Sequence, residues 1–219
     1  MKGFENERKE LVEHLEKIGS LKNPEIKKAM LKVKRELFVT SEYRFDAYVD
    51  MALPIVGGAT ISQPYVYAIT FEALKLKKGE KVLEVGSGSG YGAALISELV
   101  GKKGKTITVE IVPEVCDFAK SNLKKAGYKN VKVVCSDGSI GYEKEAPYDA
   151  IIVTAACPEI PKSLVNQLKN GGRLVAPVGG ISTGQDLIFL EKDKNGEIKT
   201  KTLGGVIFLP LTGKHGYKI

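Results

Sequence analysis

KVLEVGSGSGYG, residues 81–92, is the stretch that decides the fold. Its apolar, β-prone residues between 82 and 85 predict a short buried strand. Glycines then stand at every second position from Gly86 to Gly92, and the apolar run 93–100 predicts a helix. Strand, glycine turn and helix form the first unit of a nucleotide-binding α/β fold, because glycine lets the backbone turn tightly and approach a ligand closely.

Two acids indicate which kind of nucleotide this turn binds. The dinucleotide fingerprint G-x-G-x-x-G requires a small residue at position 91, where this chain has Tyr91. Instead, Glu84 precedes the first glycine by two positions, and Glu110 closes the strand-like run 106–109. A carboxylate at the end of a second strand can accept hydrogen bonds from both hydroxyls of a ribose. We therefore predict a nucleoside site, and the alternative is a glycine turn that binds another ligand.

The arrangement E-x-G-x-G-x-G resembles motif I of the class I S-adenosylmethionine-dependent methyltransferases, and Glu110 resembles the acid of their second motif. A third strand is predicted over 131–135, and it delivers Asp137 and Gly138 at its carboxyl end. The aspartate could accept a hydrogen bond from an adenine amino group, while the glycine leaves room for the ring. The alternative is an ordinary Asp-Gly turn.

Composition indicates a soluble globular protein. The chain has 219 residues, 43% of them hydrophobic and 27% charged, and no apolar stretch reaches the roughly 20 residues that span a bilayer. The N-terminus has no apolar signal segment, so we expect a cytoplasmic protein. Cys116, Cys135 and Cys157 lack C-x-x-C spacing and are predicted to be small apolar residues rather than disulfide or metal ligands. The net charge of +7 comes from lysines scattered among glutamates, which favours solvated helix faces over a nucleic-acid surface.

The pattern predicts a single α/β domain, 1–219, with a doubly wound, Rossmann-like, mostly parallel sheet. Residues 1–63 supply an N-terminal helical extension and a loop, 64–178 the cofactor-binding core, and 179–219 antiparallel strands. In the core, further elements are predicted at helix 113–126, strand 148–154, helix 162–169 and strand 173–178. An Asn-Gly hairpin joins strands 186–191 and 197–202, and 206–209 is predicted as the last strand.

The loop 50–64 is rich in glycine and proline and lies just before a helix opened by Pro64. Such a loop beside a nucleotide site is a natural place for substrate contacts. Spacing alone favours an N-cap or turn role for Ser62, which stands two places before the proline.

The same loop resembles the signature of the protein-L-isoaspartate O-methyltransferase family, in Leu53-Pro54-Ile55 followed by Gly58-Ala59-Thr60-Ile61-Ser62-Gln63-Pro64-Tyr65. The likeness continues through Ser136-Asp137-Gly138 and Phe208-Leu209-Pro210-Leu211-Thr212, and it covers nearly the whole chain. It implies an enzyme that methylates the α-carboxyl of L-isoaspartyl residues in damaged proteins, and often the β-carboxyl of D-aspartyl residues. The ester then cyclises without the enzyme to a succinimide, which reopens partly to normal aspartate.

The resemblance also implies roles for individual residues. Ser62 is the active-site serine, and it shapes the substrate pocket with Ala59, Thr60, Ile61, Thr154 and Ala155. S-adenosyl-L-methionine, and the product S-adenosyl-L-homocysteine, is held by Glu84, Gly86, Ser87, Gly88, Gly90, Glu110, Asp137, Gly138 and Thr212. Some family members have His or Met where this chain has Tyr65, Val66 and Tyr67, so no role is assigned to these three.

The implied chemistry needs no metal and no general base. A carboxylate is already anionic at neutral pH, and the cofactor's sulfonium is already a good electrophile. Aligning them can supply on the order of 7–11 kcal/mol, so Ser62 is predicted to orient the carboxylate rather than attack. We expect a monomer that acts on isoaspartyl proteins and peptides, with no nucleic-acid or membrane partner. The alternatives are an RNA methyltransferase and a non-catalytic S-adenosylmethionine-binding module.

Overall fold

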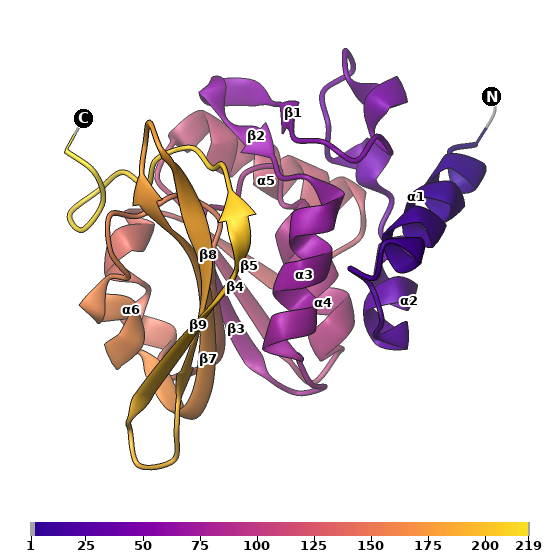
Figure 1. Ribbon diagram of the computed structural model, residues 1–219. Coiled ribbons are helices and arrows are strands. Elements are labelled where there is room, and N and C mark those ends of the chain that lie inside the picture. The colour runs from indigo at the N-terminus through magenta and orange to yellow at the C-terminus, as the bar shows by residue number, and fades with distance from the viewer. Residues whose placement is uncertain (1–2, 219) are drawn as a thin grey trace.

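A seven-stranded sheet forms the centre of the molecule, for which a computed structural model describes residues 3–218 (Figure 1). The strand order is β5-β4-β3-β6-β7-β8-β9, so the last two strands follow in chain order. The first five strands in this order run parallel, and β8 and β9 are antiparallel to their neighbours, which confirms the predicted fold class. The strands are β3 (Lys81–Val85), β4 (Lys105–Glu110), β5 (Val131–Cys135), β6 (Tyr148–Val153), β7 (Leu168–Gly180), β8 (Gly184–Lys192) and β9 (Ile198–Val206).

Helices cover both faces of the sheet. Neighbouring residues of β3 alternate between two buried clusters, with Val82 in one and Leu83 in the other, because successive side chains point to opposite faces. The first cluster lies under α3 (Pro64–Leu74), α4 (Tyr91–Val100) and α5 (Pro113–Lys125), and the second lies under α6 (Lys162–Asn166). Burial on both faces explains why the central strands are apolar almost throughout.

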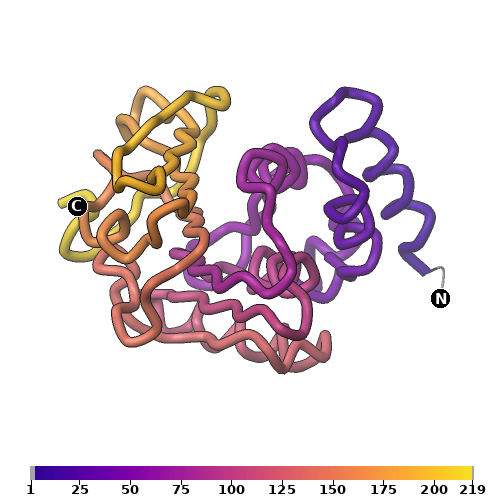
Figure 2. The backbone as a smooth tube through the Cα atoms, turned by 90° about the horizontal axis from the view of Figure 1, so that it is seen from below, coloured from indigo at the N-terminus to yellow at the C-terminus, as the bar shows by residue number. Residues whose placement is uncertain are grey.

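Two N-terminal helices, α1 (Glu5–Lys17) and α2 (Pro24–Lys32), pack on each other and join the first cluster. As predicted, Pro24 opens α2 and the Asn23 side chain caps it, accepting a hydrogen bond from the Glu25 N–H at 2.9 Å. Figure 2 shows these helices on the side of the molecule away from the C-terminal strands.

Two predicted elements are wrong. The helix expected over 162–169 ends at Asn166, because the buried Leu168 already pairs with Tyr148 as the first residue of β7. Residues 206–209 do not form a last strand, since β9 ends at Val206. There the Phe208 N–H donates to the side chain of Gln185 at 2.8 Å instead of to the backbone of a neighbouring strand. Residues 207–212 therefore cross the carboxyl ends of the parallel strands as an irregular segment, fixed by hydrogen bonds to Ala156.

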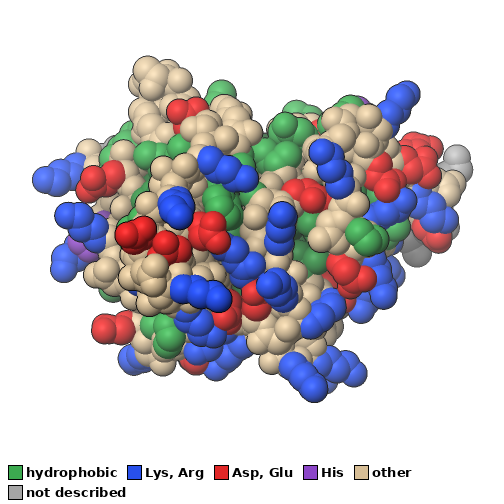
Figure 3. Space-filling view, turned by 60° about the horizontal axis from the view of Figure 1, so that its bottom comes forward, with side chains coloured by type: hydrophobic (Ala, Val, Ile, Leu, Met, Phe, Trp, Pro, Cys, Tyr) green, Lys and Arg blue, Asp and Glu red, His purple; other side chains and the backbone are tan. Residues whose placement is uncertain are grey.

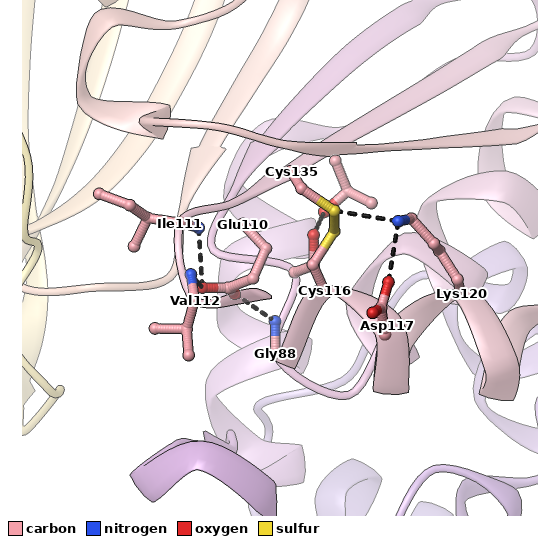
Figure 4. Close-up of a disulfide and its surroundings, with 10 residues drawn as sticks. Gly88, Glu110, Ile111, Val112, Cys116, Asp117, Lys120 and Cys135 are labelled. Carbon is pink, nitrogen blue, oxygen red and sulfur yellow. Dashed lines mark hydrogen bonds and ion pairs between the residues drawn. A yellow bond between two sulfur atoms is a disulfide. The ribbon is translucent and has the colours of Figure 1, made fainter. Parts of the chain in front are cut away.

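The expectation that every cysteine is a free apolar residue is also wrong, since Cys116 and Cys135 form a disulfide (Figure 4). Cys116 lies in the first turn of α5 and Cys135 ends β5. A parallel β-α-β crossover brings the start of its helix close to the end of the next strand, so the two Cα atoms are 5.8 Å apart despite 19 residues of separation. Cys157 is free and buried, as predicted.

Candidate active site

A cavity of about 390 Å³ lies at the carboxyl ends of β3, β4 and β6, where ligands bind in open α/β sheets. Its volume is in the range of small-molecule sites, roughly 300–1,000 Å³. Eleven of the predicted site residues line it, and the loop segment 57–62, the glycine turn and the irregular segment 207–212 contribute most of them. They are Ala59, Thr60, Ser62, Gly86, Ser87, Gly88, Glu110, Gly138, Thr154, Ala155 and Thr212.

The glycine turn can form only with glycine at its narrowest points. Gly86 has φ +95° and Gly88 has φ +50°, which side-chain-bearing residues rarely adopt. A Cβ on Gly86 would overlap the Thr154 hydroxyl, and one on Gly88 would come within 3.3 Å of the Thr60 carbonyl oxygen. The turn therefore leaves a cradle of bare backbone between β3 and the loop that carries Thr60.

Glu110 stands where a ribose-binding acid is expected. It ends β4 and is 8% exposed, with Oε1 accepting the N–H groups of Ile111 and Val112 at 3.0 and 3.2 Å. Its Oε2 accepts the Gly88 N–H at 3.1 Å, which ties the acid to the glycine turn (Figure 4). A carboxylate has about four acceptor sites, of which three are taken here, so Oε2 can still accept a hydroxyl donor of a ligand in the cavity.

Glu84 lies behind the cavity wall rather than in it. Its carboxylate is 1% exposed and accepts a hydrogen bond from the Thr108 hydroxyl at 2.7 Å. Burial raises the pKa of Glu84 to about 8, with the Thr108 hydrogen bond opposing and the Glu110 charge adding to the rise. Thr108 also lies 2.8 Å from the Ser87 hydroxyl, and Ser87 does line the cavity. Glu84 is thus connected to the cavity wall through Thr108 and Ser87.

Three further predicted residues lie outside the lining of this cavity. The Ile61 side chain is 1% exposed and belongs to the core. Gly90 is the first residue before α4 and lies against Leu123. Asp137 accepts the Ser139 N–H through one carboxylate oxygen and the Lys214 N–H through the other, both at 2.8 Å. Burial alone would raise the pKa of Asp137, but these hydrogen bonds outweigh it and lower the pKa.

A second, open groove of about 1,120 Å³ lies at the end of β7, the start of β8 and the end of β9, and it meets the first cavity at Thr60, Ser62 and Phe208. Ser62 does not cap α3, because Asp50 accepts the Tyr65 N–H at 2.8 Å and the N-cap residue Gln63 makes no side-chain cap. The Ser62 hydroxyl therefore stays at the junction of the two cavities.

Tyr67, to which no role was assigned from its sequence position, also lines the first cavity. Burial raises the pKa of its hydroxyl, the Glu84 charge adds to this, and Arg35 and the neighbouring Ser62 hydroxyl oppose it. The only sequence signal for the position of Tyr67 was its helical spacing with Phe71 and Leu74, and this spacing is typical of residues that face the core. Residues 206–209 were predicted as a strand and no site role was given to Phe208–Leu211, so the place of Phe208–Leu211 in the wall was missed as well.

Comparison with known proteins gives a consistent result. The family model described as Protein-L-isoaspartate(D-aspartate) O-methyltransferase (PCMT) matches residues 6–216. Protein-L-isoaspartate O-methyltransferase 2 of Archaeoglobus fulgidus is 50% identical over 98% of this chain and 97% of its own length. The protein-L-isoaspartate O-methyltransferase of Methanococcus aeolicus is 53% identical over 94% of each chain.

Comparison with solved structures finds proteins of the same kind. A protein-L-isoaspartate O-methyltransferase superposes with a TM-score of 0.87 at 35% identity, over 95% of this chain and 67% of the other. A putative protein-L-isoaspartate O-methyltransferase from Plasmodium falciparum, in complex with S-adenosyl-L-homocysteine, has a TM-score of 0.83 at 29% identity. That alignment covers 94% of this chain and 98% of the other.

Proposed function

The chain belongs to the protein-L-isoaspartate(D-aspartate) O-methyltransferase family, and from this premise we propose that it transfers the methyl group of S-adenosylmethionine to the α-carboxyl of L-isoaspartyl residues. The observation that carries the proposal is the junction of a cofactor-sized cavity with an open groove at Ser62. A methyl donor in the one and a peptide carboxylate in the other would meet there. The methyl ester would then cyclise to a succinimide without the enzyme.

The cavity fits a nucleoside cofactor through the residues that the chain supplies. Glu110 offers its Oε2 to a ribose hydroxyl, and the bare backbone at Gly86 and Gly88 admits a ligand where a Cβ would intrude. Gly138 and Thr212 also line the cavity, Thr212 from the irregular segment. When bound, the cofactor supplies an electrophilic methyl group on a sulfonium.

The groove suits an extended peptide that carries a free carboxylate. It is open and lined mostly by small or neutral residues of β8, β9 and the loop before α3. Neither cavity has Lys or Arg in its lining, within the described residues 3–218. A substrate carboxylate would therefore lose none of its nucleophilicity to an ion pair with the protein, and the sulfonium would be its only close cation.

We propose that Ser62 orients that carboxylate by donating a hydrogen bond, with Thr60 beside it. The reaction needs alignment of oxygen, methyl carbon and sulfur, because the carboxylate is already ionised at neutral pH. A resident metal or a general base is not required by this chemistry. The one cluster with metal-ligand spacing within residues 3–218 is Cys116, Asp117 and Cys135, whose two sulfurs are bonded to each other.

The test uses labelled S-adenosylmethionine and two synthetic peptides that differ only in L-isoaspartate or L-aspartate at one position. Label on the isoaspartyl peptide alone is the expected result. Label on neither peptide, with normal cofactor binding, would contradict the proposal and favour a non-catalytic binding module. A third peptide with D-aspartate tests whether the activity extends to that residue.

Ser62→Ala tests the role of the serine. Methyl transfer should fall between about tenfold and a hundredfold, because the carboxylate loses its orienting donor. The dissociation constant of S-adenosyl-L-homocysteine, measured by calorimetry, should stay within about twofold of the original. Unchanged turnover would remove Ser62 from the mechanism.

We further propose a monomer that works in the cytoplasm without a nucleic-acid partner. No helix within residues 3–218 is long and apolar enough to cross a membrane. On the face seen in Figure 3, Lys and Arg side chains are spread among Asp and Glu rather than gathered in a patch. Ion pairs engage some of the charges of the molecule, since Lys105 and Lys132 both bind Glu145. Transfer RNA should not be methylated, and light scattering should give the mass of one chain.

A further inference from the structure

Asp50 connects the two ends of the loop that carries Thr60 and Ser62, since it precedes the loop and bonds to residues that follow it. Within the loop, β1 (Leu53–Pro54) pairs antiparallel with β2 (Thr60–Ile61), so residues 53–61 form a short hairpin. Ser62 follows β2 directly and lies two residues before α3. Its position therefore depends on how the hairpin is joined to the helix.

Asp50 connects the chain before the hairpin to the start of α3 through two hydrogen bonds. Its side-chain Oδ1 accepts the Tyr65 N–H at 2.8 Å, in the first turn of α3. Its backbone carbonyl accepts the Gln63 side-chain amide at 3.1 Å. Both donors lie within three residues of Ser62, one on the adjacent residue, so Asp50 fixes the chain immediately after the serine.

Asp50 is in turn held by a buried arginine. Arg35 is fully buried, and its guanidinium donates to the Ala47 carbonyl at 2.8 Å and to the Met51 carbonyl at 3.4 Å. These two carbonyls flank Asp50 on either side. The guanidinium also lies 5.1 Å from the ring centroid of Tyr91, the first residue of α4. The segment 47–51 is thus attached to the same core element that follows the glycine turn.

The geometry points to Asp50 as a positioning residue for methyl transfer, acting through Ser62 and resting on the proposed function of that serine. Asp50 touches neither cavity, so it has no contact of its own with substrate or cofactor. Its two hydrogen bonds set the distance between the hairpin and α3. Displacement of a catalytic group by about 1 Å can lower a rate a hundredfold, so a residue that only holds this connection can have a large effect on turnover.

Three variants separate this role from a merely structural one. Asp50→Ala removes the acceptor, whereas Asp50→Asn keeps an oxygen for the Tyr65 N–H, since Asn and Asp cap helices about equally well. Asp46→Ala is the matched control, because Asp46 is exposed, directly precedes the segment 47–51, and makes no side-chain hydrogen bond within residues 3–218. We expect kcat to fall about tenfold in Asp50→Ala, with the dissociation constant of S-adenosyl-L-homocysteine unchanged. Asp50→Asn and Asp46→Ala should stay within about twofold of the original kcat.

The decisive comparison is with Ser62→Ala. If Asp50 acts through Ser62, the double variant Asp50→Ala/Ser62→Ala should have the same kcat as Ser62→Ala alone, within about twofold. Effects that multiply in the double variant would overturn the inference while leaving the proposed function intact. Absence of label on the isoaspartyl peptide with the unchanged protein would instead contradict the proposed function.

A measurement without substrate tests the inference about Asp50 whether or not the proposed function is correct. Amide hydrogen exchange at residues 60–66 should accelerate at least tenfold in Asp50→Ala, and return to the original rate in Asp50→Asn. Exchange in α4 should be the same in all variants, which shows that the fold is retained. Unchanged exchange at 60–66 in Asp50→Ala would refute the positioning role.

Discussion

Glu84 makes the stability of this protein depend on pH in an unusual direction. Its carboxyl is fully buried, has the Thr108 hydroxyl as its donor, and titrates with a pKa of about 8, compared with 4.5 for an ordinary glutamate. Between these two values the unfolded chain releases a proton that the folded chain keeps. The free energy of unfolding contributed by this group is therefore fully present below about pH 4.5 and is lost as the pH rises towards 8.

The magnitude follows from the width of that interval. Each pH unit is worth about 1.4 kcal/mol, so the full interval corresponds to about 5 kcal/mol. Relaxation around a buried charge reduces such figures, and about 5 kcal/mol is an upper value. This is a large fraction of the 5–15 kcal/mol that is typical for a whole domain.

Glu84→Gln isolates the effect, because glutamine keeps the shape and the hydrogen-bonding capacity but does not titrate. Urea unfolding of both proteins at pH 5, 6, 7, 8 and 9 gives the difference in their free energies of unfolding. Other titrating groups cancel in this difference, which should move steadily in favour of Glu84→Gln up to pH 8 and then level off. A difference that stays constant to within about 0.5 kcal/mol would refute a neutral buried Glu84.

Two further predictions concern the cofactor site and its support. Glu110→Gln should raise the dissociation constant of S-adenosyl-L-homocysteine at least tenfold in calorimetry, because hydrogen bonds to a charged acceptor contribute about 1.5–3 kcal/mol; an unchanged constant would contradict its role at the ribose. Cys116→Ser should lower the free energy of unfolding by about 2–4 kcal/mol, as expected for a disulfide that closes a loop of this length. Alkylation of the unfolded protein should find one free thiol, that of Cys157, before reduction and three after it. Three free thiols without reductant would show that the bond does not form.

The sequence was sufficient to predict those elements whose local residue pattern agrees with their place in the fold. The run 81–92 predicted β3, the glycine turn and α4, and the apolar strands predicted a sheet covered on both faces. Glu110 could be assigned because the end of a parallel strand is a position that the fold itself brings to the ligand crevice.

Contacts between segments far apart in the sequence determined the features that the sequence pattern did not predict. Asp137 follows β5 as predicted, but its two carboxylate oxygens accept the Ser139 and Lys214 N–H groups, and the residue is not part of the cavity lining. Ser62 has the spacing of a cap, yet Asp50 caps α3 from fifteen residues before Tyr65. The Cys116–Cys135 bond depends on a crossover that brings together residues with no recognisable spacing. Each of these outcomes requires knowing which segments meet in space.

The wall formed by residues 207–212 determines when during synthesis the enzyme becomes competent to bind its cofactor. The glycine turn, Glu110 and Gly138 all belong to elements that leave the ribosome well before this segment. The segment is fixed only once Leu209 and Leu211 have bonded to Ala156 and Lys214 has bonded to Asp137. A nascent chain that has folded its parallel strands but still lacks residues 207–214 therefore has a cavity without this wall.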